Sequence, residues 1–361
     1  MSMTIDQLLT FAVDQRAADL FLQAGTLPRL RVDGLVREVD APALTDEQVR
    51  GFIRAIAPRA VADDLEPALA RGFDFSYALG ARARFRVNLY RHLGTPGMVI
   101  RIIPPRIRTF DELHLPPVLA EIVAERRGLT LLSGATGSGK SSTLAAMVDY
   151  LNDHYHAKVL TIEDPVEFVH ASKKCLITHV EVGTDTPSFE HGLRQAVRQA
   201  PDVILVGELR DAETVRMALR AADTGHQVLG TIHAADAAQT VERLLALVPP
   251  GELAIAREQL AHALVGVVAQ RLARAQAGDL RPVVEVLRGD AVTAKFILDD
   301  RLGELADYIA TRQHGMRTFD NDILDLHHRG ILAEPEALRV ATNRDAVAFG
   351  IRVADHPPGP A

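Results

Sequence analysis

The chain has 361 residues, enough for two domains, and its 47% hydrophobic and 24% charged residues are typical of a folded globular protein rather than a disordered one. Its 40 Lys and Arg residues against 47 Asp and Glu residues give a net charge of −7, so it lacks the surplus of positive charge that favours tracking along nucleic acid. A single cysteine, Cys175, excludes an intramolecular disulfide and a multi-cysteine zinc site within one chain.

Neither a signal peptide nor a membrane-spanning segment is expected from the sequence. The first residues lack a positive region followed by an apolar one, and no apolar run approaches the ~18 to 20 residues that cross a bilayer. Together with the lone cysteine, this pattern favours a cytoplasmic protein whose contact with a membrane is peripheral.

Residues 1–103 are predicted to form a small α+β domain built on an antiparallel sheet. A helical opening is followed by short alternating stretches, for example at residues 83–88. Pro104-Pro105 then interrupts the chain, and Pro116-Pro117 opens the next helix. We therefore place a linker at residues 104–115.

Residues 116–270 are predicted to form an α/β domain. Four short apolar runs each look like a strand buried on both faces, and helical stretches alternate with them. The four runs span residues 129–133, 159–162, 203–206 and 228–232. We expect a parallel sheet wound by right-handed crossovers.

The remainder of the chain is predicted to be a helical C-terminal region with a disordered tail. From about Gly251 the pattern becomes predominantly helical. With the α/β domain ending at residue 270, the helical C-terminal region is assigned to residues 271–361. The tail from Ala354 onward is rich in proline and is not expected to form regular structure.

A phosphate-binding loop is predicted after the first apolar run, where residues 134–141 match the pattern G-x-x-x-x-G-K-[ST] and precede a helix. The glycines let the backbone curl so that its N–H groups point inward, and the helix adds the positive end of its dipole. We expect Lys140 to neutralise the β- and γ-phosphates of ATP and the Ser141 hydroxyl to bind Mg²⁺. The expected nucleotide contacts are Gly134, Thr136, Gly137, Ser138, Gly139, Lys140, Ser141 and Ser142.

Two further strands are expected to deliver acids to the same edge of the sheet. Glu208 follows the run at 203–206 and Glu163 follows the run at 159–162. An acid after a buried strand is more often a helix cap or a loop charge, but beside a phosphate-binding loop both become catalytic candidates. We expect Glu208 to hold Mg²⁺ and one of the acids to orient the attacking water.

Two histidines bracket the fourth apolar run. A histidine at a strand end in an ATP site can donate a hydrogen bond to the γ-phosphate or to the attacking water. His233 lies at the expected catalytic edge and is favoured as functional. For His226, a contact with the nucleotide and a purely structural role both stay open.

These separated motifs together resemble one family, the secretion and pilus ATPases of type II/type IV systems. They look like its Walker A motif, Asp box, Walker B motif and His box, which lie here at residues 134–141, 161–167, 203–208 and 224–233. The similarity continues through the first domain and beyond the ATPase motifs. It covers residues 18–21, 31–34, 84–88 and 315–320.

Within that family the chain is similar to the pilus-retraction subgroup, PilT and its paralogue PilU. Three details favour PilU: Ala135 where PilT has a proline, residues 199–202 before the Walker B motif, and the stretch at 281–287. The helix at 291–298 replaces the retraction signature that PilT carries there.

The resemblance implies a PAS-like N-terminal domain and a RecA-like ATPase domain in a hexameric ring. It also implies arginines of the N-terminal domain that close onto the nucleotide, at the matching positions Arg86 and Arg101. The implied function is an ATP-hydrolysing motor that drives or assists pilus retraction, as a homohexamer or in a ring with a PilT-like paralogue. Its load would be an inner-membrane platform protein at the inner face of the inner membrane.

Two other functions stay open. The same ATPase could serve a type II or type IV secretion channel, although secretion and extension members commonly carry a four-cysteine module that one cysteine cannot supply. The chain could instead be a regulatory subunit that binds nucleotide beside a paralogue and hydrolyses little. The presence of both Glu163 and Glu208 disfavours that hypothesis.

Overall fold

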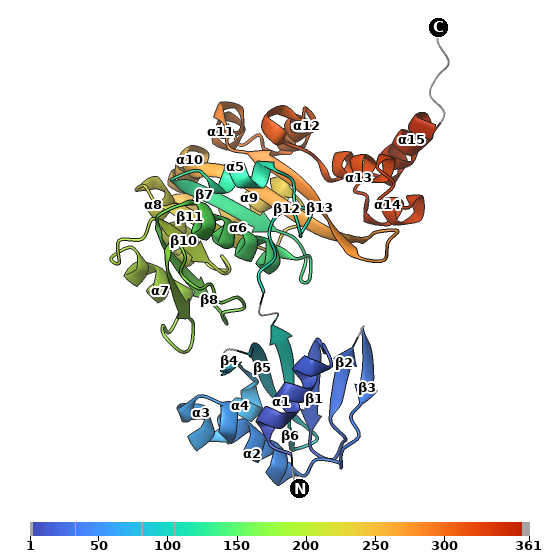
Figure 1. Ribbon diagram of the computed structural model, residues 1–361. Coiled ribbons are helices and arrows are strands. Elements are labelled where there is room, and N and C mark those ends of the chain that lie inside the picture. The colour runs from blue at the N-terminus through green and yellow to red at the C-terminus, as the bar shows by residue number, and fades with distance from the viewer. Residues whose placement is uncertain (1–2, 33, 81, 104–105, 356–361) are drawn as a thin grey trace. The chain divides into compact units, whose positions relative to one another are not determined.

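The computed structural model describes residues 3–32, 34–80, 82–103 and 106–355 (Figure 1). Contacts divide the chain into two compact units. The first unit consists of the chain up to Arg106 together with Asp164–Val169, and the second unit consists of Ile107–Glu163 and the chain from His170 onward. The chain therefore leaves the second unit directly after Glu163 and returns to it at His170, which the sequence did not indicate.

The first unit is an α+β domain, as predicted. Its described residues form a six-stranded sheet in the order β3-β2-β1-β6-β5-β4, in which all neighbours pair antiparallel. The strands are β1 (Asp19–Gln23), β2 (Arg29–Val32), β3 (Leu35–Glu38), β4 (Phe73–Leu79), β5 (Ala83–His92) and β6 (Thr95–Ile103). The helices are α1 (Ile5–Asp14), α2 (Asp46–Ile56), α3 (Arg59–Asp63) and α4 (Leu65–Arg71).

Alternation along the strands builds the core of this unit. On β5, Phe85, Val87 and Leu89 are buried, whereas the residues between them face away from the core. Helices α1 and α2 begin at side-chain caps, because Thr4 and Thr45 each form a capping box with a glutamine three residues later.

The second unit is built on a seven-stranded sheet in its described part, in the order β13-β12-β7-β11-β10-β8-β9. The predicted runs correspond to β7 (Gly128–Ser133), β8 (Lys158–Glu163), β10 (Val203–Val206) and β11 (Gln227–Ile232). Neighbouring strands from β12 to β9 pair in parallel, so the predicted parallel sheet is confirmed. The other strands are β9 (Leu176–Glu181), β12 (Leu264–Arg274) and β13 (Leu280–Arg288).

Helices cover both faces of this sheet (Figure 1). One face packs on α5 (Val118–Val123) and α6 (Lys140–His154). The helices on the other face are α7 (Phe189–Ala196), α8 (Ala212–Asp223), α9 (Ala237–Ala246), α10 (Leu253–Ala263), α11 (Ala291–Leu298) and α12 (Leu305–Ala310). Burial on both faces explains why the central strands are continuously apolar, and it confirms the α/β class.

The prediction of a helical region from Gly251 onward is wrong for residues 264–288. These residues form β12 and the antiparallel strand β13, which extend the sheet beside β7. Helix α10 ends at Ala263 and β12 begins at Leu264, so no glycine or proline separates them and the apolar pattern runs on without a break. Chain that we assigned to a helical C-terminal region is therefore part of the ATPase sheet.

The C-terminal helices pack against the hairpin formed by β12 and β13. They are α13 (Phe319–His328), α14 (Glu334–Val340) and α15 (Arg344–Asp355), and their buried side chains gather on Ala269, Ala273 and Val283 (Figure 1). Short 3₁₀ segments lie at Pro250–Glu252, Leu302–Glu304 and Gln313–Gly315.

Two predicted boundaries also change. Helix α15 extends to Asp355, so the irregular tail does not begin at Ala354, and residues 356–361 lie outside the described residues. Residues 104 and 105 of the predicted linker are likewise not described. The later part of that linker is not a spacer, because Leu115 is buried in the core of the second unit. In the part of the chain that the structure describes, no helix combines the length and apolar character needed to span a bilayer.

The close approach of β13 to β12 gives a test of the strands that were not predicted. The N–H of Gly289 donates to the Val265 carbonyl at 2.8 Å, and a Cβ on Gly289 would lie 1.7 Å from the Leu264 carbonyl oxygen. Gly289→Ala is expected to lower the free energy of unfolding by about 1–3 kcal/mol, because backbone atoms must move apart. Gly251→Ala is the control, since its Cβ would meet no atom within 4 Å. Equal stability of the two variants in chemical denaturation would contradict this packing.

Candidate ATP site

The phosphate-binding loop connects the carboxyl end of β7 to the first turn of α6. Gly134, Gly137 and Gly139 have φ values of 141°, 79° and 93°, a region that favours glycine, so the backbone curls as the pattern predicts. The Lys140 side chain lies against the curved backbone of this loop. Its Nζ donates hydrogen bonds to the carbonyl oxygens of Gly134 at 2.8 Å and Ala135 at 2.9 Å.

The loop offers polar groups that suit a phosphate. Ser138 is 6% exposed, and its Oγ has no hydrogen-bond partner among the described residues. A buried hydroxyl without a partner is costly, and an anion bound in the curl would give it an acceptor. The exposed residues Thr136 and Gly137 lie at the tip of the loop, while Ser141 is exposed on the first turn of α6 and Ser142 is half-buried.

A buried glutamine on strand β12, which the sequence analysis did not identify, supports the phosphate-binding loop. Gln270 on β12 is 3% exposed, donates from Nε2 to the Ser138 carbonyl at 2.8 Å, and accepts the Thr143 hydroxyl proton at 2.8 Å. A Cβ on Gly134 would lie 2.4 Å from the Gln270 carbonyl oxygen, so the loop rests directly on this strand. The one available signal was a polar residue within the apolar run at 264–270.

Glu208 follows β10 at the edge of the sheet where the phosphate loop leaves β7. The turn is fixed on both sides, because Gly207 N–H donates to the Ile162 carbonyl at 2.7 Å and the Thr231 hydroxyl donates to the Gly207 carbonyl. The Glu208 side chain is 19% exposed. Its Oε2 lies 2.7 Å from an Arg210 nitrogen, and its Oε1 lies 3.5 Å from His233 Nε2.

Glu163 ends the neighbouring strand β8. A Cβ on Gly207 would lie 3.3 Å from the Glu163 Cα. Glu208 follows Gly207 directly, so the backbone that carries Glu208 lies next to the backbone that carries Glu163. The Glu163 Oε1 lies 3.9 Å from His179 Nδ1, and both side chains are 18% exposed. The structure therefore brings Lys140, Glu163, Glu208 and His233 to one edge of the sheet.

His226 does not join them. It precedes β11, whereas the phosphate loop and His233 lie beyond the other ends of β7 and β11, and six strand residues at ~3.3 Å each put about 20 Å between the two histidines. Its Nδ1 donates to the Ala221 carbonyl at 3.0 Å, and its own carbonyl accepts the Gly128 N–H. The predicted nucleotide contact is thus not formed within one chain, and the structural role that stayed open agrees with these bonds.

Arg86 and Arg101 lie in the first unit as a directly opposed pair on β5 and β6, so their side chains share one face of that sheet. Arg86 Nε lies 3.5 Å from an Asp74 oxygen. Arg101 Nε lies 3.0 Å from Asp19, a carboxylate that is 5% exposed and also accepts from Arg31. Both guanidinium groups therefore have acidic partners within their own unit.

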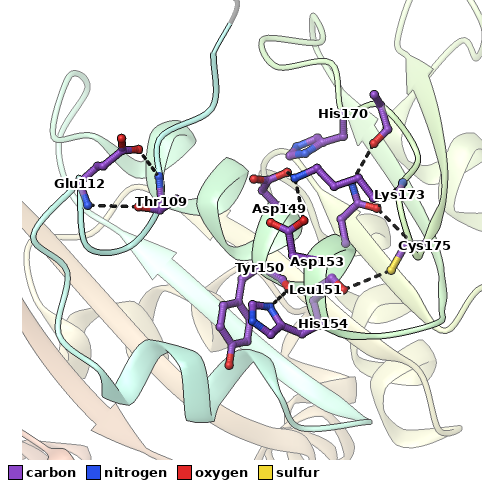
Figure 2. A network of polar contacts seen from close by, with 12 residues as sticks. Thr109, Glu112, Asp149, Tyr150, Leu151, Asp153, His154, His170, Lys173 and Cys175 are labelled. Carbon is purple, nitrogen blue, oxygen red and sulfur yellow. Dashed lines mark hydrogen bonds and ion pairs between the residues drawn. The ribbon is translucent and has the colours of Figure 1, made fainter.

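The far end of α6 is tied to the loop at residues 170–175 (Figure 2). Lys173 Nζ lies 2.9 Å from carboxylate oxygens of both Asp149 and Asp153. Cys175 is buried, its thiol donates to the Tyr155 carbonyl at 3.1 Å, and burial raises the pKa of this thiol. The thiol is thus part of the packing between α6 and this loop.

No described set of three or more His, Cys, Asp or Glu residues could hold a metal ion. The acids at the edge nevertheless suit Mg²⁺, because this ion takes oxygen ligands and usually completes its shell with water and substrate phosphates. The Ser141 hydroxyl and the Glu208 carboxylate supply two such oxygens near the phosphate loop.

Comparison with known proteins places the chain among pilus and secretion ATPases. The sequence pattern of the family described as "Type II/IV secretion system protein" matches residues 1–299. The chain is 42% identical to "Type IV pilus retractation ATPase PilT" of Pseudomonas aeruginosa, with 93% of this chain and 97% of the relative covered. It is 38% identical to "Twitching motility protein" of Neisseria gonorrhoeae over 89% and 86% of the two chains.

The solved structures agree with these sequence matches. The "Crystal Structure of the Pilus Retraction Motor PilT and Bound ADP" superimposes with a TM-score of 0.88 at 32% identity, covering 96% of this chain and all of that one. The ATPase DotB of Legionella pneumophila gives a TM-score of 0.77 at 26% identity, with 94% and 96% covered.

The expected tilt toward PilU is not supported by the identities. The chain is 35% identical to "Type IV pilus ATPase PilU" of Pseudomonas aeruginosa over 98% of its length, against 42% for PilT of the same organism. The three local details that favoured PilU, such as Ala135 in the loop, are outweighed when nearly the whole chain is compared.

Gln270 gives a test of how the loop is held. Gln270→Met keeps the volume but leaves the Ser138 carbonyl and the Thr143 hydroxyl without this partner, at a cost of about 1–3 kcal/mol. We expect the Kd for ATP to rise about tenfold, measured with a fluorescent nucleotide. Gln227→Met is the matched control, because Gln227 is equally buried and its amide donates to the Val123 carbonyl at the opposite edge of the sheet. Equal weakening of ATP binding in both variants would contradict a local role.

Proposed function

This chain belongs to the family of type II/IV secretion system proteins, and from that premise we propose that it is an ATP-hydrolysing motor that drives or assists retraction of a type IV pilus. One observation carries the proposal: the glycine loop with Lys140 and the acids Glu163 and Glu208 lie at one edge of the sheet. They do so in a chain that is 42% identical to a pilus retraction ATPase along 93% of its length. Its reaction is the hydrolysis of ATP to ADP and phosphate.

Binding begins with Lys140. Its ammonium group exchanges the carbonyl oxygens of Gly134 and Ala135 for the β- and γ-phosphate oxygens, so a hydrogen-bonded cation is already in place before the nucleotide arrives. The loop N–H groups and the Ser138 hydroxyl add donors to the phosphates. Gln270 keeps the curl in shape for this exchange.

Ser141 and Glu208 would hold Mg²⁺, which would supply positive charge to the phosphate oxygens. Glu163 accepts a hydrogen bond from the attacking water and orients it toward the γ-phosphorus. The water oxygen forms a bond to the γ-phosphorus as the bond between the γ-phosphorus and the bridging oxygen breaks. ADP takes the electron pair, and the proton that the water loses passes to the phosphate product. His233, which contacts Glu208, donates a hydrogen bond to the γ-phosphate.

We also assign Arg86 and Arg101 to the γ-phosphate. The transferred group stays anionic, and a guanidinium that reaches it only when ATP is bound makes closure of the two domains depend on the γ-phosphate. Support comes from their shared face on the first unit. The resemblance of the sequence to the family implies arginines at these two positions. The domain boundary that this closure requires falls near Arg106, where the contacts divide.

The proposed assembly is a ring of six chains, either of this protein alone or with a PilT-like paralogue. The structural likeness to the pilus retraction motor over 96% of this chain supports it. The proposed load is the inner-membrane platform protein at the pilus base, with the ring at the inner face of that membrane.

Purified variants test the chemistry. Lys140→Ala is expected to lose ATP binding and hydrolysis together, because the loop then lacks the ammonium group that pairs with both the β- and γ-phosphates. Glu208→Gln is expected to retain ATP binding and lose at least about 100-fold in kcat. Glu258→Gln, which changes an exposed acid on α10, is the control and should match the wild type. Wild-type turnover by Lys140→Ala would remove this site, and a monomer that hydrolyses ATP at the full rate would contradict the ring.

A deletion strain tests the cellular role. Loss of the protein is expected to reduce twitching motility, and the wild-type chain should restore it whereas Lys140→Ala should not. Normal twitching combined with failed protein export would defeat the pilus assignment in favour of secretion. Normal twitching restored by Lys140→Ala would instead favour a regulatory subunit that does not need to hydrolyse ATP.

A further inference from the structure

A histidine outside the described motifs lies beside the acid that orients water. His179 is on β9, the edge strand, and pairs directly with Thr161 on β8, two residues before Glu163. Side chains two residues apart on a strand point to the same face, so Thr161, Glu163 and His179 share one face of the sheet. The sequence motifs of the ATPase do not include His179.

The contacts of His179 decide which ring nitrogen carries the proton. Its Nε2 lies 3.1 Å from the backbone nitrogen of His170 and accepts that N–H, since a backbone N–H can only donate. The neutral ring must then carry its proton on Nδ1. This nitrogen lies 2.9 Å from the Thr161 hydroxyl and 3.9 Å from the Glu163 carboxylate.

The N–H that sets this tautomer belongs to the loop held by α6 (Figure 2). Asn152 on α6 is fully buried and bonds three backbone groups of the loop. Its Nδ2 donates to the Ala171 carbonyl at 2.8 Å, and its Oδ1 accepts the N–H groups of Lys173 at 2.9 Å and Cys175 at 3.3 Å. Because α6 begins at Lys140, the helix that carries the phosphate-binding lysine also fixes the loop beside His179.

The surroundings of His179 add no positive charge at its ring. The ring of His170 stacks on it at 5.8 Å, and burial lowers the pKa of His170 to about 3, so this second imidazole is neutral. The nearby ammonium of Lys173 is paired with Asp149 and Asp153. His179 therefore faces Glu163 as an imidazole ring fixed by Thr161 and His170, at 3.9 Å from the carboxylate.

We propose that His179 is a positioning residue for Glu163: with Nε2 accepting the His170 N–H and Nδ1–H donating to the Thr161 hydroxyl oxygen, its ring is held 3.9 Å from the carboxylate and keeps it in the orientation that receives the attacking water. The inference rests on the proposed function of Glu163. His179 acts on the chemical step through that carboxylate, and none of its contacts involves the phosphate loop. Its loss therefore lowers kcat and leaves the KM for ATP unchanged.

Three variants test this role. His179→Ala is expected to lower kcat about tenfold with KM within about twofold, because the Glu163 carboxylate loses the ring that limits its orientation. His179→Gln should restore kcat to within about twofold, because its amide oxygen can accept the His170 N–H while its NH₂ donates to Thr161. Thr178→Ala, on the opposite face of β9, is the matched control and should behave as the wild type.

The outcomes separate this inference from the proposed function. Wild-type kcat in His179→Ala, or a loss in His179→Gln as large as in His179→Ala, overturns the positioning role. A weaker ATP affinity or a lower melting temperature that accounts for the whole loss overturns it too. In a Glu163→Gln background, His179→Ala should cause no further loss if it acts through Glu163. Full activity of Glu163→Gln alone would defeat the proposed role of Glu163, and with it this inference.

Discussion

Parallel pairing of β8, β10, β11 and β7 is the constraint on which the site depends. Parallel strands place their carboxyl ends at one edge, so the phosphate loop, His233, Glu208 and Glu163 leave the sheet as neighbours. Hydrogen bonds from Gly207 N–H to Ile162 and from the Thr231 hydroxyl to Gly207 fix the turns at this edge. A slip of one residue in any pair would turn these side chains to the opposite face.

The parts of the site that the sequence could predict are those with a local signature. Four apolar runs and a glycine loop are recognisable without knowing what packs on them. Gln270 has no such signature, because α10 passes into β12 without a turn residue and the strand itself was not expected. His226 shows a different limit: the sequence placed it and His233 at two ends of one strand, and two ends of a strand cannot both face the same loop.

Helix α6 connects the phosphate-binding loop to the residues that surround Glu163. Its first residue is Lys140, which we assign to the phosphates, and its buried Asn152 holds the loop whose His170 N–H orients His179 beside Glu163. The chain between Glu163 and His170 belongs by its contacts to the first unit. Glu163, the residue that we propose to orient water, is therefore the last residue before the chain passes from the second unit to the first.

The central claim is that Lys140 exchanges its own loop for the phosphates of ATP while the two glutamates manage metal and water. A crystal structure with Mg²⁺ and a non-hydrolysable ATP analogue tests it most directly. The account predicts that Lys140 Nζ leaves the Gly134 and Ala135 carbonyls for the β- and γ-phosphates, with Ser141 and Glu208 at the metal. A nucleotide bound elsewhere, with Lys140 still on both carbonyls, would contradict it.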